Sequence, residues 1–283
     1  MSTRIRIFSS SIVLVALLAS VGCQGSKTEP TENEKVSQAY HKSILLSDQG
    51  KYNEAEQVLN QALKESPESV ELVTQLMTVK AAKSGLKLLD YFPLVEIVLN
   101  IKENEKASQR RRELYAEVLQ KTQTTNSEVL SAQELNQILY VLETVLNIVE
   151  AINAIPPLSS SNVIYVEDAL NLYRSKPDLE YSKGDHYLAL LLQLTIFKFR
   201  IQSRFYSQTL QFEALGRDDL LRSLDNFKTD LTALLDLLLK IEPENAAAEK
   251  LRGEVLKVWS KIEAFVLRTQ LDIYGLLSHG DMP

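Results

Sequence analysis

The chain has 283 residues, of which 45% are hydrophobic and 24% charged, a composition that excludes wholesale disorder, a collagen-like fibre and a polytopic membrane protein. Its single cysteine excludes an internal disulfide framework and a zinc site built on several thiolates. Nine glycines and eight prolines are few for this length, which disfavours a sheet of many strands. The formal net charge of -6 disfavours a nucleic-acid partner, because such partners need a basic surface.

Residues 1–22 have the pattern of a secretory signal peptide. Arg4 and Arg6 precede an apolar run over residues 12–19, which is too short to remain as a membrane-spanning helix. Residues 18–23, Leu-Ala-Ser-Val-Gly-Cys, resemble the lipobox of bacterial lipoproteins and depart from its common pattern only at the serine, where leucine is usual. A plain cleaved signal or a buried N-terminal helix is the alternative interpretation.

The lipobox resemblance implies both a location and a membrane anchor. Cys23 would become the mature N-terminus and carry palmitate or similar acyl chains, and burial of several such chains makes a stable anchor. Gln24 after the cysteine implies the outer membrane of a diderm bacterium, facing the periplasm. The residues that follow are wholly polar, so we expect a lipidated flexible tether over residues 23–35.

Residues 36–68 have the spacing of two short antiparallel helices. Apolar positions recur on either side of Gln49-Gly50 with helical periodicity. The segment resembles a tetratricopeptide repeat, and the residues that carry this resemblance are Gly50, Tyr52, Ala55, Ala62 and Pro67. The resemblance implies that these residues pack the two helices together. A chance helical hairpin is the alternative.

Capping patterns predict where the next helices begin. Asn53 with Glu56 predicts the start of the second helix, and Ser66 followed by Pro67 predicts the start of a third. In a tetratricopeptide repeat the first helix of each unit lines the concave surface. The resemblance therefore implies these partner-binding candidates on the first helix: Tyr40, Lys42, Ser43 and Ser47.

Helical periodicity continues through the rest of the chain, which we expect to form one helical domain over residues 36–283. Ser131 and Glu134 form a capping-box pattern before an apolar series that Pro156-Pro157 ends. Apolar stripes recur over residues 220–238 and 251–269. The extended candidate at 162–166 is short and continues as a helix, so we predict no strand.

Residues 187–197 are apolar on nearly all sides but too few to span a membrane, which predicts a central helix packed on several faces. Such a helix favours a compact core over an open superhelix. The predicted fold class is all-α, with tetratricopeptide-like hairpins at the N-terminus that continue into an irregular compact helical bundle or solenoid.

The sequence contains no glycine-rich phosphate loop, no paired histidines at metal-binding spacing and no nucleophile elbow. We therefore expect no catalytic residue, no cofactor and no metal. His186 lies at the start of the apolar segment, Arg110 belongs to a run of arginines, and Phe199 and Arg200 belong to an alternation of rings and cations. These four are candidates for a ligand or anion site, with helix capping, a solvated helix and core packing as the alternatives.

Together these features predict a lipid-anchored periplasmic helical-repeat protein, non-catalytic, that acts as an interaction scaffold or adaptor in the cell envelope. Its expected partner is an envelope protein or peptide. The alternative is a carrier of a hydrophobic small molecule, because compact helical lipoproteins with hidden repeats resemble the T component of tripartite (TRAP) periplasmic transport systems. A bundle built on residues 187–197 and on the similarly apolar stretch 86–101 would then enclose a ligand cavity.

Overall fold

The computed structural model describes residues 31–86, 131–152, 158–205 and 217–269, together with Ala116 and Gln120. Every regular element in this part of the chain is a helix, which confirms the all-α prediction. The helices are α1 (Glu32–Asp48), α2 (Tyr52–Glu65), α3 (Val70–Lys83), α6 (Ala132–Ile152), α7 (Val163–Arg174), α8 (Lys183–Phe205), α9 (Arg217–Ile241) and α10 (Ala246–Thr269). Within the described residues, no helix is long and apolar enough to cross a membrane.

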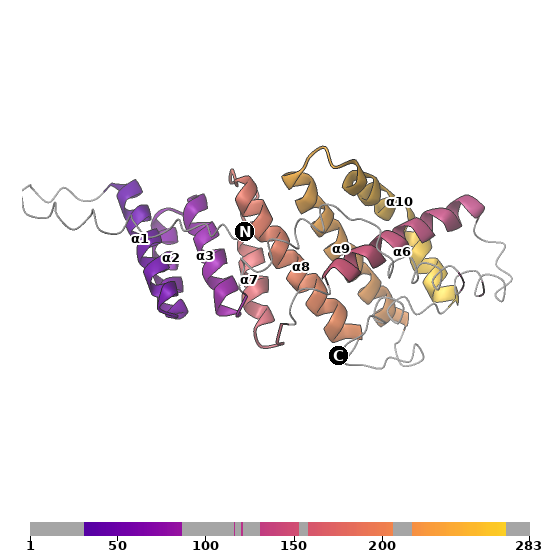
Figure 1. Ribbon diagram of the computed structural model, residues 1–283, viewed down its shortest axis with the longest axis horizontal. Coiled ribbons are helices and arrows are strands. Elements are labelled where there is room, and N and C mark those ends of the chain that lie inside the picture. Colours follow the sequence, from indigo (N-terminus) through magenta and orange to yellow (C-terminus); the bar gives the residue numbers. More distant parts are fainter. Residues whose placement is uncertain are drawn as a thin grey trace, which may run out of the picture.

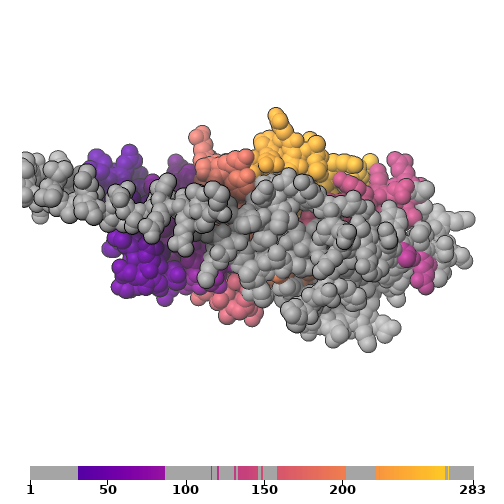
Figure 2. All heavy atoms as spheres, in the orientation of Figure 1, coloured from indigo at the N-terminus to yellow at the C-terminus, as the bar shows by residue number. Residues whose placement is uncertain are grey.

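The helices α1, α2, α3, α7, α8, α9 and α10 pack in a row in which each contacts the next (Figure 1). Two of these neighbours, α3 and α7, are separated in the sequence by residues 84–162. The helix α6 comes from that intervening segment but packs against α10. Figure 2 shows α1 and α2 at one end of the molecule and α6 toward the other end. The order of helices in space thus differs from their order in the sequence.

Local hydrogen bonds determine where the first hairpin begins and turns. Glu34 N donates to Thr31 Oγ1 at 3.4 Å, and Thr31 N donates back to Glu34 Oε2 at 2.7 Å, which forms a capping box. The prediction of a flexible tether over 32–35 is therefore wrong, because this box starts α1 at residue 32. Gly50, with a φ of 71°, reverses the chain after α1, and its N–H donates to Ser47 O at 2.9 Å.

Two predicted helix starts near the first hairpin are wrong. The helix α2 begins one residue before Asn53 without a side-chain cap, and Glu56 pairs with lysines of α3. The cap of α3 is Ser69 rather than Ser66. Ser66 ends α2 instead, and its hydroxyl donates to Glu32 Oε1 at 2.8 Å. Glu56 and Ser66 thus bind residues of other helices in place of the local caps that the sequence pattern predicted.

Two other predictions about helix starts are confirmed. At the start of α6, Glu134 N donates to Ser131 Oγ at 3.2 Å and Ser131 N donates to Glu134 Oε2 at 2.9 Å. This pair is the predicted capping box. Residues 163–166 begin α7, which confirms the predictions that this short extended candidate is not a strand and that the chain continues from it as a helix.

The predicted central helix, residues 187–197, lies within α8, which packs between α7 and α9 (Figure 1). Its buried apolar residues are Ala189, Leu190, Leu191, Leu192, Leu194, Ile196 and Phe197. They belong to a core cluster that runs from α3 to α10, while a smaller cluster joins α1, α2 and α3. The prediction that residues 187–197 pack on several faces is confirmed.

Glu56 of α2 joins neighbouring helices through ion pairs. Its carboxylate lies 3.1 Å from Lys80 Nζ and 2.6 Å from Lys83 Nζ, both on α3, and Lys80 also pairs with Asp168 of α7 at 3.2 Å. Burial raises the pKa of Glu56, but hydrogen bonds from Lys83 and Lys80 outweigh it, and the pKa lies below its ordinary value. The Glu56 side chain is only 14% exposed, so water screens these pairs little.

Replacing Glu56 by glutamine is expected to lower the free energy of unfolding by about 1–3 kcal/mol, because two partly buried lysines lose their shared acid. Urea unfolding at neutral pH measures the loss. The control is Lys35→Gln, which removes an ion pair with Glu65 whose side chains are 50% and 53% exposed, and it should cost much less. Equal losses in the two variants would show that the Glu56 pairs do not hold α2 on α3.

Candidate functional site

Three of the four partner-binding candidates share one face of α1, and that face packs inward. Ser43 Oγ donates to Tyr40 O at 2.7 Å, and Ser47 Oγ donates to Ser43 O at 2.8 Å. Ser43 is 0% exposed, so its prediction as a partner contact is wrong. Tyr40 and Ser47 are half-buried, and Tyr40 packs against the cluster that joins α1 to α2 and α3. Residues three and four apart on a helix face the same way, so packing of the hairpin covers Tyr40, Ser43 and Ser47 together.

Lys42, the fourth candidate, is exposed and lies in a groove of about 370 Å³ between α1 and α2. The groove is lined by Lys35, Val36, Gln38, Ala39, Lys42, Val58, Gln61, Ala62, Glu65 and Ser66. The structure therefore does not bring the four predicted residues together into one binding surface.

The residues predicted to pack the repeat lie in different environments. Ala55 is fully buried and Tyr52 half-buried, and both pack in the cluster that joins the hairpin to α3. Ala62 is half-buried and lines the groove between α1 and α2, and Gly50 makes the turn between them. Pro67 is exposed, so its predicted packing role is wrong, and its carbonyl oxygen instead accepts a hydrogen bond from Lys176.

The candidates for an anion site do not converge. Arg110 lies outside the described residues, as do Cys23 and the predicted signal. Arg200 Nη1 donates to Asp230 Oδ1 at 2.5 Å and Nη2 donates to Glu167 Oε1 at 2.9 Å. These two carboxylates neutralise Arg200, so its prediction as an anion ligand is wrong. Phe199 is half-buried on α8 and stays a prediction.

His186 belongs to a polar cluster where α7 and α9 end and α8 begins. The Tyr173 hydroxyl lies 2.7 Å from His186 Nδ1, and Lys240 Nζ donates to the same hydroxyl at 3.2 Å. Because the ammonium can only donate, the hydroxyl accepts from Lys240 and its own proton remains available for Nδ1 of a neutral imidazole. Burial and then the charge of Lys240 lower the pKa of His186, against the opposing effect of Asp185.

The stability of the protein is therefore expected to depend on pH through His186. The unfolded side chain titrates near 6.5 and the folded one at lower pH, so the folded state binds fewer protons between these values. The stability that neutral His186 contributes is fully present above the unfolded pKa. It is lost as the pH falls from the unfolded pKa through the lower folded pKa. His186→Asn keeps an acceptor for Tyr173 but does not titrate.

Urea unfolding of both proteins from about pH 7 to pH 5 tests this expectation. The free-energy difference that favours the wild type over His186→Asn should shrink as the pH falls. A difference that stays constant across this range would contradict the lowered pKa.

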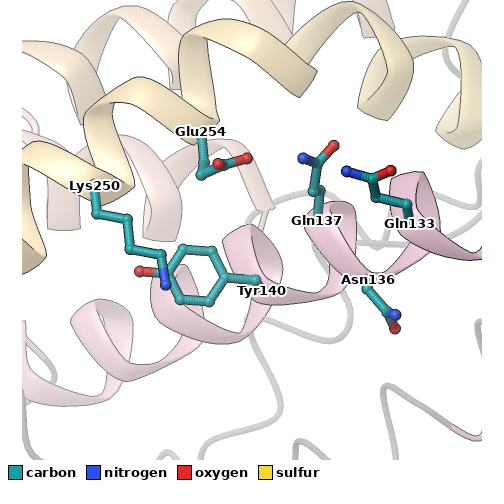
Figure 3. Close-up of a pocket in the computed structure, with 6 residues that line it drawn as sticks. All are labelled: Gln133, Asn136, Gln137, Tyr140, Lys250 and Glu254. Carbon is teal, nitrogen blue, oxygen red and sulfur yellow. The ribbon is translucent and has the colours of Figure 1, made fainter.

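A second groove, which the sequence reasoning missed, lies between α6 and α10 (Figure 3). Its volume is about 600 Å³, and it is lined by Gln133, Asn136, Gln137, Tyr140, Lys250 and Glu254. In Figure 3, Gln137 and Glu254 extend into the space between the two helices, whereas Asn136 points away from α10. The groove therefore has amides along one wall and two charged groups on the other.

Packing on both sides of the groove holds the helices α6 and α10 in place. The capping box starts α6. The face of this helix that points away from the groove is buried through Ile138, Leu139, Val141, Leu142 and Val145. The helix α10 buries Leu251, Val255 and Val258, and its Lys261 pairs with Glu134 of α6. A signal for the groove was present in the sequence, because the polar residues at 133, 136, 137 and 140 recur at three- and four-residue spacing in a largely apolar helix.

The groove offers hydrogen bonds and charge rather than reactive groups. Glu254 Oε2 is buried without a hydrogen-bond partner, and Lys250 Nζ lies 4.5 Å from the centroid of the Tyr140 ring. Side-chain amides both donate and accept, so Gln133 and Gln137 match the donors and acceptors of a peptide backbone. In the described part of the chain, no cluster of histidine, cysteine or acidic residues could hold a metal ion. The arrangement suits non-covalent binding of a polar chain.

Comparison with known proteins returned no match to a family model, to a curated protein or to a solved structure. The function of this helical protein therefore has to be argued from its own residues.

Proposed function

We propose that the protein is a non-catalytic adaptor of the bacterial envelope, anchored at the outer membrane through a lipid on Cys23 and facing the periplasm. The lipobox resemblance of residues 18–23 supports the anchor, and the row of helices supports the binding role. A row in which each helix packs on its neighbours presents an extended surface, as repeat proteins do. Its partner would be an envelope protein or one of its extended segments.

The observation that carries the binding role is the groove between α6 and α10. Its amides, its buried Glu254 oxygen without a partner and the exposed Lys250 are groups that a peptide ligand would satisfy. An unpaired buried carboxylate oxygen costs stability, and its retention is explained if a ligand pairs with it. A role for Lys42, in the groove between α1 and α2, as a partner contact stays a prediction.

The alternative function, carriage of a hydrophobic ligand, rested on two apolar segments, residues 187–197 and 86–101. The first gives it no support, and the second lies outside the described residues except for Leu86. Residues 187–197 pack their apolar side chains into the core, and Phe197 is 1% exposed. Carriage stays a prediction, and the adaptor role is the one that the α6–α10 groove supports.

The lipid anchor predicts a simple change in location. Cys23→Ser removes the only thiol of the chain, so the variant should lose metabolically incorporated palmitate and move from the membrane pellet to the soluble fraction of a diderm host. A variant with Ser20 replaced by leucine keeps the thiol and should stay in the membrane. Palmitate labelling that persists in Cys23→Ser would contradict the anchor.

Site-specific cross-linking tests the binding role in living cells. A photoreactive amino acid at Gln137, in the groove, should give an adduct of discrete mass, whereas the same group at Ile164 should not, although Ile164 on α7 is 55% exposed. The adduct should weaken when Gln133 is replaced by leucine. Equal adducts at both positions, or none at Gln137 in several growth conditions, would contradict a partner in this groove.

A further inference from the structure

We propose that the α6–α10 groove recognises an extended peptide that carries a basic side chain, which pairs with Glu254 and lies on the ring of Tyr140. In the free protein, Lys250 occupies part of this cation site. The inference rests on the binding function proposed above and adds the chemistry of the ligand.

Glu254 has a buried carboxylate oxygen that the protein leaves without a hydrogen bond. Lys250 precedes it by four residues on α10, a spacing at which a lysine and a glutamate on one helix can reach each other, although the reverse order pairs better. Lys250 instead places its ammonium over the Tyr140 ring, 4.5 Å from the centroid. The carboxylate is thus free to accept a hydrogen bond from a cationic group that enters the groove, and a hydrogen bond to a charged group is among the stronger ones.

The position of Lys250 shows that an ammonium fits against this ring. Cation–π contacts are worth about 0.5–2 kcal/mol, and Tyr140 is the aromatic residue of the groove. Lys250 is exposed and makes no ion pair in the described part of the chain, so little holds it in place. A lysine or arginine side chain of a ligand would displace it and gain both the ring and the carboxylate, which Lys250 does not reach.

The spacing of the amides favours a peptide over a small diamine. Gln133 and Gln137 are four residues apart on α6, which is about 6 Å along the helix axis. Residues two apart in an extended peptide are about 6.6 Å apart, so the two amides match alternate peptide units. A free diamine would share the pairing with Glu254 but would have no partner for these amides.

The test is selection of random decapeptides displayed on phage against the full-length protein, purified in detergent and immobilised. The wild type should enrich peptides with lysine or arginine at a fixed position. For the best enriched peptide, synthesised and measured by fluorescence anisotropy, Glu254→Gln should weaken binding at least about tenfold. Lys250→Met should tighten it, because it removes the internal competitor. Excess 1,5-diaminopentane should compete poorly with the peptide.

The control is Glu249→Gln, which makes the same charge change on α10 at an exposed residue outside the groove lining and should leave binding unchanged. Circular dichroism melting curves that coincide would show that the variants are folded. Enriched peptides without a basic preference, unchanged binding by Glu254→Gln, or equal competition by the diamine would overturn this inference and leave the adaptor role standing. Failure to enrich any peptide would contradict both.

Discussion

Replacing Phe197 by alanine is expected to lower the free energy of unfolding by about 3–5 kcal/mol. Phe197 of α8 is 1% exposed, and its ring centroid lies 5.2 Å from that of Phe227 on α9. Phe227 in turn stacks on Trp259 of α10 at 6.1 Å. Removing the first ring leaves a cavity in a chain of aromatic contacts that joins α8, α9 and α10.

Urea unfolding followed by circular dichroism measures this loss, since the helical signal reports on the whole row. The matched control is Leu256→Ala on α10, where the side chain is 50% exposed and truncation should have little effect. A loss below about 1 kcal/mol for Phe197→Ala would mean that α8 is not the centre of the core.

Replacing Arg200 by methionine is expected to cost about 3 kcal/mol. The arginine of α8 pairs with Asp230 of α9 and Glu167 of α7, and the Asp230 side chain is only 5% exposed. Without the guanidinium, the Asp230 carboxylate remains buried without its charged partner. We place the loss at the lower end of the range for buried pairs because the Arg200 side chain is 32% exposed and water reaches it.

Two further variants separate charge from packing at Arg200. The double variant Arg200→Met with Asp230→Leu should recover part of the lost stability, because it removes the uncompensated charge. The control Arg252→Met breaks a pair with Asp236 whose side chains are 41% and 49% exposed, and it should cost much less than Arg200→Met. A double variant less stable than Arg200→Met alone would contradict this explanation.

Local features of the fold were predictable because they depend on residues close in the sequence. The capping box at Ser131 and Glu134 and the buried segment 187–197 belong to this class. Tertiary contacts explain the predictions that failed. Glu56 meets lysines on α3 instead of capping α2, and Arg200 meets acids on two other helices instead of remaining free.

The site was harder to predict than the fold, because it depends on which helices become neighbours. Gln137 and Glu254 are more than a hundred residues apart in the sequence, and no periodicity indicates that α6 returns to α10. In the same way, the contact between α3 and α7 across residues 84–162 follows from the tertiary fold alone. On α1, the repeat resemblance placed Tyr40, Ser43 and Ser47 on the first helix but could not show that the face they share is buried.

Hydrogen exchange of the full-length protein, with and without a peptide enriched by the wild type, tests most directly whether the α6–α10 groove is the binding site. Ligand contacts slow the exchange of the backbone amides that they order or cover. We expect slower exchange in α6 around Gln133 to Tyr140 and in α10 around Lys250 to Glu254, with no change in α1 and α2. Slower exchange confined to α1 and α2, or no change in any helix, would contradict the proposed site.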